Sequence, residues 1–397
     1  MIRRVVITGV GAVSGAGGSS KDHLSALLAG RSLARRLTDP WFDEFVRPIG
    51  VPVSTTVPAV DGLPRYVALA DLAIAEAVSE SGLTGPERAD TRLITATATG
   101  AIVELESAFR GGRILPPGQF SFDHVTEWAH MRHGVGGNGG VMTVSTGCTA
   151  GLDALGSGYD TVASGRASRV LVVAAEAPFC PFVLGAFTNI GALSNRDVDP
   201  EHASCPFSQD RDGFVLGEGA AAVVLEELPA AIARGAAPLI EVFGWASVSS
   251  AYHMTRIRTS GVDIAASIRE ALDDAGLPPT AVEALDAHGT STPLNDAAEC
   301  AAYRDVFGDR SSQLPVVAQK GVTGHSLGAA GLLEVAGISR YLPVGMLPPT
   351  GNTTPRTLDA QLDLVLGEPR HAEPEIIVKT SSGFSGIHTA VVFGRVP

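Results

Sequence analysis

One cysteine of this sequence has the setting of a nucleophile. Cys148 follows an apolar run at 141–145 that predicts a buried strand, and an apolar helical pattern follows it. The small residues Gly147, Ala150 and Gly151 leave room for a substrate beside the sulfur. At a helix N-terminus, peptide dipoles and backbone N–H groups stabilise a thiolate. Both effects favour the thiolate and raise nucleophilic reactivity, so we predict that Cys148 is a reactive nucleophile.

The other three cysteines carry no such signal. Free cysteines are usually buried and inert, so we interpret Cys180, Cys205 and Cys300 as structural. No pair has the C-x-x-C spacing of a zinc site, and four cysteines in 397 residues do not form a disulfide framework. The sequence therefore predicts no metal and a reducing, cytoplasmic compartment.

A histidine and two threonines lie at the end of another predicted strand. His288, Thr290 and Thr292 belong to DAHGTSTPLND at 286–296, which follows an apolar segment. A strand end can hold a side chain in a site on a rigid support. An isolated histidine more often has a structural role, so this segment is a candidate only in combination with others.

A lysine and a second histidine lie five residues apart in QKGVTGHSLGAAG at 319–331. A lysine beside an apolar strand is usually solvated, but Lys320 here precedes a histidine at a predicted helix N-terminus. That position disfavours imidazolium, so we expect His325 to be neutral and able to donate a hydrogen bond to a developing enolate oxygen.

Gly383 and Phe384 lie between two apolar runs near the C-terminus, in SSGFSGIHTAVVF at 381–393. Glycine beside an aromatic residue indicates a backbone that approaches a ligand closely. N–H groups of this turn could bind an oxyanion. A plain hairpin turn is the other interpretation.

These candidates require an α/β scaffold to position them. Runs rich in Val and Ile, bounded by glycine or polar residues, predict strands buried on both faces. Helical patterns at 66–81 and 261–275 lie between them, so we expect covered sheets. The runs are VVITGVGAV near the start and those at 141–145, 169–177, 220–227, 239–248, 314–319, 376–382 and 389–396.

An internal similarity relates the two halves of the chain. TVSTGCTAGLDALGSG at 143–158 and QKGVTGHSLGAAGLLE at 319–334 each place Thr-Gly before a chemical residue that opens a helix. A duplicated half would put Cys148 and His325 at corresponding helix N-termini. We expect an N-terminal half at 1–237 that carries the cysteine and a C-terminal half at 238–397 that carries the histidines and lysine.

The charge balance restricts the partners. The net charge of −13 disfavours nucleic acid and anionic membrane surfaces, and no apolar window is long enough for a membrane span. An acidic protein partner would need a local basic patch, for which Arg65, Arg256 and Arg258 are weak candidates.

Together these segments resemble the β-ketoacyl carrier-protein synthase family of the thiolase-like superfamily. The resemblance covers essentially the whole chain, and it implies a five-layer αβαβα fold of two similar halves. STGCTAGLD and HASCPF with RDGFVLGEGAA are most similar to ketosynthase α subunits of type II polyketide synthases. AYHMT and GTSTP also suit the fatty-acid elongation branch. The matching segments are VVITGVGAV, STGCTAGLD, SNRDVDPEHASCPFSQDRDGFVLGEGA, AYHMT, DAHGTSTP, KGVTGH and the final GF.

The resemblance implies a role for each candidate residue. Cys148 would be the acylated nucleophile, while His288 and His325 would promote malonyl decarboxylation and hold the enolate. Lys320 would order the site and supply positive charge. The backbone N–H groups of Cys148 and Phe384 would form the oxyanion hole.

The same resemblance implies the substrate arm and the partners. Thr290 and Thr292 would bind the phosphopantetheine arm of an acyl carrier protein. Gly383 and Phe384 would also contact the substrate, and Phe384 would act as a gate beside the sulfur. No further cofactor is expected. Family members pair through a large apolar interface, so we expect a heterodimer with a chain-length-factor homologue. The alternative is a homodimeric fatty-acid elongation enzyme.

The sequence departs from the family pattern at three places. The family usually has Arg and Asp where this chain has Cys205 and Ser208. It usually has Ser or Thr before the catalytic lysine and Ser after it, where Gln319 and Gly321 stand here. The family's terminal GFGGTN reads Gly383, Phe384, Ser385, Gly386, Ile387 and His388, which we expect to change gate motion and pocket shape.

Two other functions compete with a condensing enzyme. GCTAG superficially resembles the nucleophile elbow of a hydrolase, but the central residue of such a motif is the nucleophile, and here it is Thr149. A catalytically silent chain-length factor would not need Cys148, His288 and His325 together.

Overall fold

The computed structural model describes residues 3–43, 45, 48–58, 62–115, 121–196, 199–356, 358 and 361–396. Within this part of the chain an 11-stranded sheet consists of two similar parts. The first runs in the order β1 (Val5–Val13), β8 (Gly219–Glu227), β6 (Arg169–Glu176), β4 (Arg92–Ala96) and β5 (Val141–Val144). The second runs β9 (Ile240–Ser249), β16 (Ile387–Gly394), β15 (Ile376–Ser382), β10 (Ala284–Asp286), β11 (Pro315–Val317) and β13 (Asp363–Leu364).

The two parts repeat the same strand directions. Counted outward from the junction of β1 with β9, each part has two antiparallel pairs and then two parallel pairs, and the second part continues with a third parallel pair between β11 and β13. β5 and β11 therefore correspond, and Cys148 follows the first while His325 follows the second. This order confirms the predicted duplication. The boundary between residues 237 and 238 stays a prediction.

The apolar runs form strands because both of their faces are covered. Every residue of β1 is buried, and so is nearly every residue of β6 and β8. Each run that the sequence indicated as a strand is a strand in the structure, and both predicted helices are present. Buried Val and Ile side chains on two faces stabilise such strands without polar alternation.

Two central helices connect the parts of the sheet. α6 (Ala150–Ala163) and α12 (Leu327–Val344) share one hydrophobic cluster with strands of both parts. They approach closely because glycine lies between them: a Cβ on Gly151 would be 2.8 Å from the carbonyl oxygen of Gly328. Cys148 and His325 precede these two helices, so the duplication brings both residues to the middle of the molecule.

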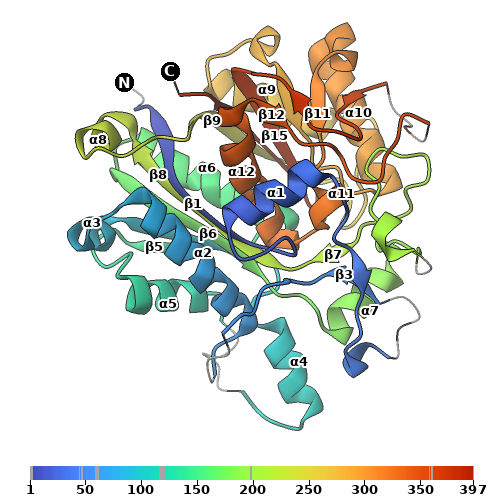
Figure 1. The fold of residues 1–397 in the computed structure, drawn as a ribbon, viewed down its shortest axis with the longest axis horizontal. Coiled ribbons are helices and arrows are strands. Elements are labelled where there is room, and N and C mark those ends of the chain that lie inside the picture. The colour runs from blue at the N-terminus through green and yellow to red at the C-terminus, as the bar shows by residue number, and fades with distance from the viewer. Residues whose placement is uncertain are drawn as a thin grey trace.

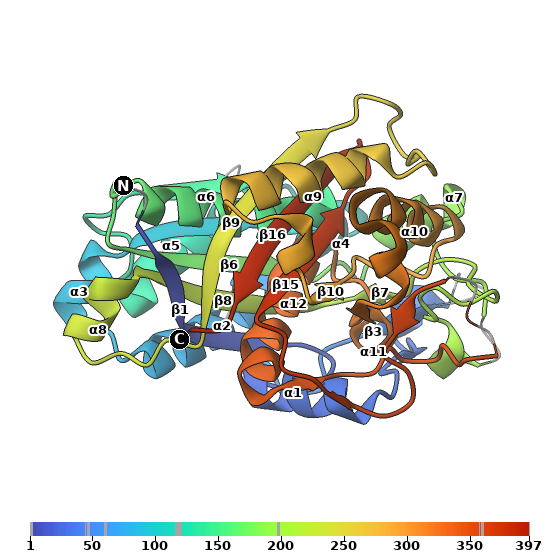
Figure 2. The ribbon, with the colours of Figure 1, turned by 90° about the horizontal axis from the view of Figure 1, so that it is seen from above.

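Two outer helix pairs complete the layers. α2 (Arg65–Ser81) and α5 (His124–His133) cover the first part of the sheet, and α9 (Val262–Asp274) and α10 (Pro293–Phe307) cover the second. Figure 1 shows these pairs on opposite sides of the molecule. Figure 2 shows α9 lying across β9 and β16. The order of layers is αβαβα, as the resemblance implies.

The remaining helices and strands are mostly short. Among the described residues, no helix has the length and the hydropathy that crossing a membrane requires. The remaining helices are α1 (Ser20–Ala29), α3 (Gly85–Asp90), α4 (Ile102–Arg110), α7 (Pro181–Asn189), α8 (Leu228–Ala233) and α11 (Lys320–Thr323). The remaining strands are β2 (Arg35–Arg36), β3 (Ile49–Val51), β7 (Leu216–Gly217), β12 (Met346–Leu347) and β14 (Arg370–His371).

Candidate active site

The cysteine lies in a tight turn that one buried carboxylate holds. A 3₁₀ turn at Gly147–Thr149 carries Cys148 and runs directly into α6. Gly147 has a φ of 68°, a left-handed conformation that favours glycine. The hydroxyl of Thr149 donates to Asp153 Oδ2 at 2.8 Å, and Thr389 of β16 donates to the other carboxylate oxygen. Asp153 thus ties the cysteine turn to the C-terminal half.

Burial opposes ionisation of the Cys148 thiol, while its position at a helix start favours it. Burial raises the pKa of Cys148 to about 11, because desolvation outweighs the opposing effects of Lys320 and of backbone N–H donors. The helix start that the sequence indicated is present, but desolvation of the buried sulfur opposes its effect on the thiol. The nucleophile must lose its proton as it reacts.

Two backbone N–H groups converge on the sulfur. Those of Phe384 and of Cys148 itself act as hydrogen-bond donors to the thiol and favour its ionised form. Phe384 lies in a short hairpin between β15 and β16, closed by Gly383 N–H donating to the Ile387 carbonyl at 2.8 Å. Its ring lies 6.1 Å from that of Phe187, measured between centroids. Two backbone donors beside a nucleophilic sulfur could bind an oxyanion that forms there.

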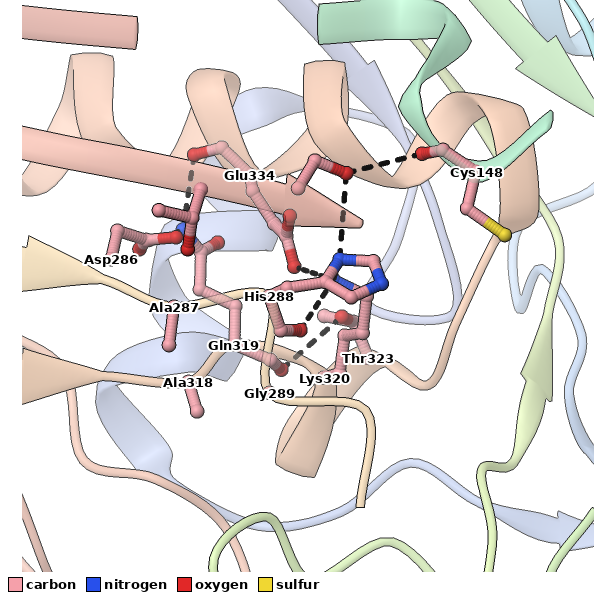
Figure 3. A network of polar contacts seen from close by, with 12 residues as sticks. Cys148, Asp286, Ala287, His288, Gly289, Ala318, Gln319, Lys320, Thr323 and Glu334 are labelled. Carbon is pink, nitrogen blue, oxygen red and sulfur yellow. Dashed lines mark hydrogen bonds and ion pairs between the residues drawn. The ribbon is translucent and has the colours of Figure 1, made fainter. Parts of the chain in front are cut away.

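His288 is fixed by its backbone and by a buried lysine (Figure 3). The N–H groups of His288 and Gly289 each donate to Glu299 at 2.7 Å. Lys320 donates to the His288 carbonyl at 2.7 Å, to Glu334 Oε1 at 2.5 Å and to His288 Nδ1 at 3.2 Å. An ammonium group only donates, so Nδ1 must accept and the ring proton sits on Nε2.

The second histidine stands at right angles to the first. The ring centroids of His288 and His325 are 5.3 Å apart with an interplanar angle of 89°. Burial, followed by the charge of Lys320, holds the pKa of both imidazoles well below its ordinary value. This direction favours the neutral form that the sequence predicts for His325, with burial and the nearby lysines as its causes.

A cavity of about 540 Å³ joins these residues. Among the predicted site residues, only Lys320 does not line it; this lysine is buried directly behind His288. Thr290 and Thr292 lie side by side in its wall, with hydroxyl oxygens 2.9 Å apart. The predicted residues that line the cavity are Cys148, His288, Thr290, Thr292, His325, Gly383 and Phe384.

The three arginines weighed as a docking patch differ in their environments. Arg65 forms an ion pair with Glu218 at 2.6 Å, and Arg258 forms one with Asp263 at 3.1 Å. Arg256 is exposed and lines the cavity. Only Arg256 thus combines exposure with a place at the site.

Sequence reasoning missed the charged groups behind the site. Glu334, Lys379 and Asp286 are buried around Lys320, and Glu299 holds the His288 backbone. A signal was available for two of them: Glu334 interrupts the apolar pattern of LGAAGLLEV, and Lys379 interrupts the apolar run IIVKTSS. A lone charge inside a buried element requires a partner.

The residues at which this chain departs from the family pattern make defined contacts in the structure. Cys205 is buried and its N–H donates to the Ser291 hydroxyl at 2.9 Å. Gln319 donates to Asp286 Oδ2 at 2.7 Å. Ser385 adopts a φ of 71°, which is strained for a residue with a Cβ. His388 pairs through Nδ1 with the Ser382 hydroxyl at 3.0 Å and lines the cavity.

Comparison with known proteins shows which family this chain belongs to. The model of the β-ketoacyl synthase N-terminal domain matches residues 2–231, and that of the C-terminal domain matches residues 239–354. The chain therefore belongs to the β-ketoacyl synthase family, enzymes of the acyltransferase class that catalyse a condensation.

Individual relatives span the full length of the chain. It is 38% identical to the granaticin polyketide putative beta-ketoacyl synthase 1 of Streptomyces violaceoruber, over 100% of this chain and 99% of that protein. It is 34% identical to 3-oxoacyl-[acyl-carrier-protein] synthase 2 of Coxiella burnetii, over 99% of each.

Solved structures agree with this assignment. A type II PKS acyl-carrier protein in complex with its ketosynthase bound to the hexaketide gives a TM-score of 0.91 at 32% identity, with 100% of both chains covered. The ishigamide ketosynthase/chain length factor gives a TM-score of 0.89 at 32% identity, also with 100% of both chains covered.

Proposed function

We propose that this protein is a ketosynthase of type II polyketide biosynthesis. It joins an acyl unit held on Cys148 to a malonyl unit held on an acyl carrier protein. The observation that carries this proposal is one cavity in which Cys148 faces two neutral, buried imidazoles, with Lys320 fixing the tautomer of one of them. A hydrolase needs one such imidazole and a water path, not this pair.

The first half-reaction is acyl transfer to the cysteine. The sulfur of Cys148 bonds to the thioester carbon, the carbon–sulfur bond to the carrier arm breaks, and the cysteine proton ends on the released thiol. Because burial raises the pKa of Cys148 to about 11, deprotonation accompanies the attack. The N–H groups of Cys148 and Phe384 bind the charge that develops on the carbonyl oxygen, each worth about 3 kcal/mol.

The second half-reaction forms the carbon–carbon bond. The bond between the malonyl carboxylate and its neighbouring carbon breaks, carbon dioxide leaves, and the electron pair passes into an enolate. His288 donates Nε2–H to the enolate oxygen, and His325 supports it from the perpendicular ring. The enolate carbon attacks the acyl carbon, the bond to the Cys148 sulfur breaks, and that sulfur takes up a proton.

The carrier protein presents both substrates on its phosphopantetheine arm. The hydroxyls of Thr290 and Thr292 are placed to bind the arm along the cavity wall, and no other cofactor is needed. Arg256 offers one positive charge to an acidic carrier on the exposed rim. We propose that the reaction takes place in the cytoplasm.

The polyketide pathway is favoured over fatty-acid elongation by two observations. Several full-length relatives at 34% to 38% identity are polyketide ketosynthases. The hairpin between β15 and β16 also departs from the family pattern at Ser385, Ile387 and His388. Ser385 has a left-handed backbone, and His388 lines the cavity. A fatty-acid synthase of the elongation branch is the alternative, as the Coxiella burnetii relative illustrates.

The first half of the chain offers a face for a partner subunit. Among the described residues, β5 pairs on one side only, with β4, and its Val141 is 52% exposed. Phe109 of α4 is 84% exposed. An open strand edge with exposed apolar side chains favours pairing with another chain. We propose that this partner is a chain-length-factor homologue; a second copy of this chain is the alternative.

Product analysis separates these functions. The protein is incubated with malonyl carrier protein and with a carrier protein bearing a saturated acyl group, alone and with a co-expressed chain-length factor, and thioester products are released and identified by mass spectrometry. A polyketide ketosynthase yields chains with several unreduced keto groups, and only with the partner. A single elongation of a saturated acyl chain by the protein alone would instead establish the fatty-acid role.

A further inference from the structure

A second lysine is buried behind the candidate site. Lys379 is fully buried on β15, and the structure places it between the carboxylates of Asp286 and Glu334. With Lys320 these groups form a set of two ammonium groups and two carboxylates from four different elements. The sum of their charges is zero, so the protein core can accommodate all four.

The strand register explains the position of Lys379. Asp286 and Lys379 are direct neighbours on the parallel strands β10 and β15, so their side chains emerge on the same face. Lys379 Nζ lies 3.0 Å from Asp286 Oδ1 and also donates to the carbonyl of Ala287 at 3.0 Å. The hydroxyl of Tyr341 donates to Asp286 Oδ2 at 2.9 Å, alongside Gln319. Asp286 is therefore rigidly held.

Glu334 is shared by the two lysines. Its Oε1 accepts from Lys320 at 2.5 Å, and its Oε2 lies 2.8 Å from Lys379 Nζ. If Lys379 were absent, the whole carboxylate charge of Glu334 would act on Lys320. With Lys379 present, its ammonium group balances part of the Glu334 charge. The positive charge beside His288 is thus only partly neutralised.

We propose that Lys379 is a positioning residue that shares Glu334 with Lys320 and thereby preserves positive potential at Cys148 and the two histidines. This inference rests on the proposed function for its catalytic consequence. Positive potential at this point stabilises both the cysteine thiolate and the enolate, the two anions that the reaction forms.

The charges around the site agree with this arrangement. Burial lowers the pKa of Lys379, but Glu334 and Asp286 more than offset it, so Lys379 stays charged. After burial and Lys320, its charge contributes to the lowered pKa of His325. The charged groups that act on the two histidines are Lys320, Lys379 and, for His288, His388. Glu334 and Glu299 act on Lys320, and Lys320 and Glu176 act on Cys148.

Four variants test the inference. Lys379→Met removes the charge, and Lys379→Arg keeps it. The double variant Asp286→Asn with Lys379→Met removes a balanced pair, so it remains informative if the single variant does not fold. Arg234→Met is the matched control, since Arg234 pairs with the buried Glu226 far from the cavity.

Two rates are measured for each variant. The first is alkylation of Cys148 by iodoacetamide from pH 7 to 9, followed by mass spectrometry, which needs no catalytic activity. The second is carbon dioxide release from malonyl carrier protein. We expect Lys379→Met and the double variant to lower both rates roughly tenfold. Lys379→Arg and Arg234→Met should change neither by more than about twofold.

The outcomes separate the two proposals. Unchanged alkylation in folded Lys379→Met protein, or an equal loss in Arg234→Met, would show that Lys379 serves only the fold. If the wild-type protein releases no carbon dioxide, the proposed function fails, while the alkylation rates still decide the role of Lys379.

Discussion

The ammonium group of Lys320 lies 3.2 Å from Nδ1 of His288 and 2.7 Å from the carbonyl oxygen of the same residue. These two contacts together fix the backbone, the tautomer and the charge environment of His288. The imidazole is thereby presented to the cavity as a neutral donor through Nε2, which is the state that an enolate oxygen requires.

Replacing the nucleophile separates the two half-reactions. Cys148→Ala should abolish condensation, because no acyl-enzyme forms, but malonyl decarboxylation should persist because His288, His325 and Lys320 remain. Product thioesters and carbon dioxide release from malonyl carrier protein are measured side by side. Retained formation of β-ketoacyl product by this variant would remove Cys148 from its assigned role.

The histidines should act mainly on the malonyl unit. His288→Ala or His325→Ala is expected to slow decarboxylation about 100-fold or more, since each removes a donor to the enolate. Acylation of Cys148 should fall much less. Thermal melts accompany the kinetics, and His130→Ala on α5 serves as a control outside the cavity. An equal loss in both steps would assign the histidines to thiol activation or to the fold.

The cysteine should become more reactive as the pH rises. Because burial raises the pKa of Cys148 to about 11, the thiolate is a minor form at pH 7 and increases about tenfold for each pH unit below that value. The rate of alkylation by iodoacetamide should follow this slope from pH 7 to 9. A rate that is already constant above pH 7 would show a thiolate stabilised by the helix N-terminus.

The sequence alone predicts much of the site and little of what lies behind it. Cys148 and His325 could be located because glycine-flanked residues between a strand and a helix leave a pattern at short range. Glu334 and Lys379 were missed because their pairing depends on α12 meeting β15 across the core, a contact that no local pattern encodes. The raised pKa of Cys148 could not be predicted for the same reason, since burial depth is a property of the packed molecule.

The short hairpin between β15 and β16 carries backbone strain at Ser385. Ser385 has a φ of 71°, and Ser385→Gly should relieve about 1 kcal/mol of it, offset in part by the greater entropy of the unfolded chain. Urea unfolding measures the change. Ser385→Ala is the matched control, because it keeps the Cβ and should not stabilise. Stabilisation by both variants would place the effect in the serine hydroxyl instead.

The open edge of β5 should be the site of assembly. Val141→Lys with Met142→Lys places charges on exposed strand positions and should abolish pairing with a partner while the isolated chain keeps its thermal stability. Sedimentation of the co-expressed pair reports the assembly. A complex that persists unchanged would locate the interface elsewhere, for example at α9, where Val262→Lys is the comparison.

The central claim is that Cys148 carries the acyl chain between the two half-reactions. The direct measurement is mass spectrometry of the Cys148 peptide after incubation with an acyl carrier protein bearing a labelled acyl group, before and after malonyl carrier protein is added. The account predicts one acyl group on Cys148 that disappears into a β-ketoacyl thioester on the carrier. An acyl group on another residue, or its loss from Cys148 as the free acid alone, would contradict it.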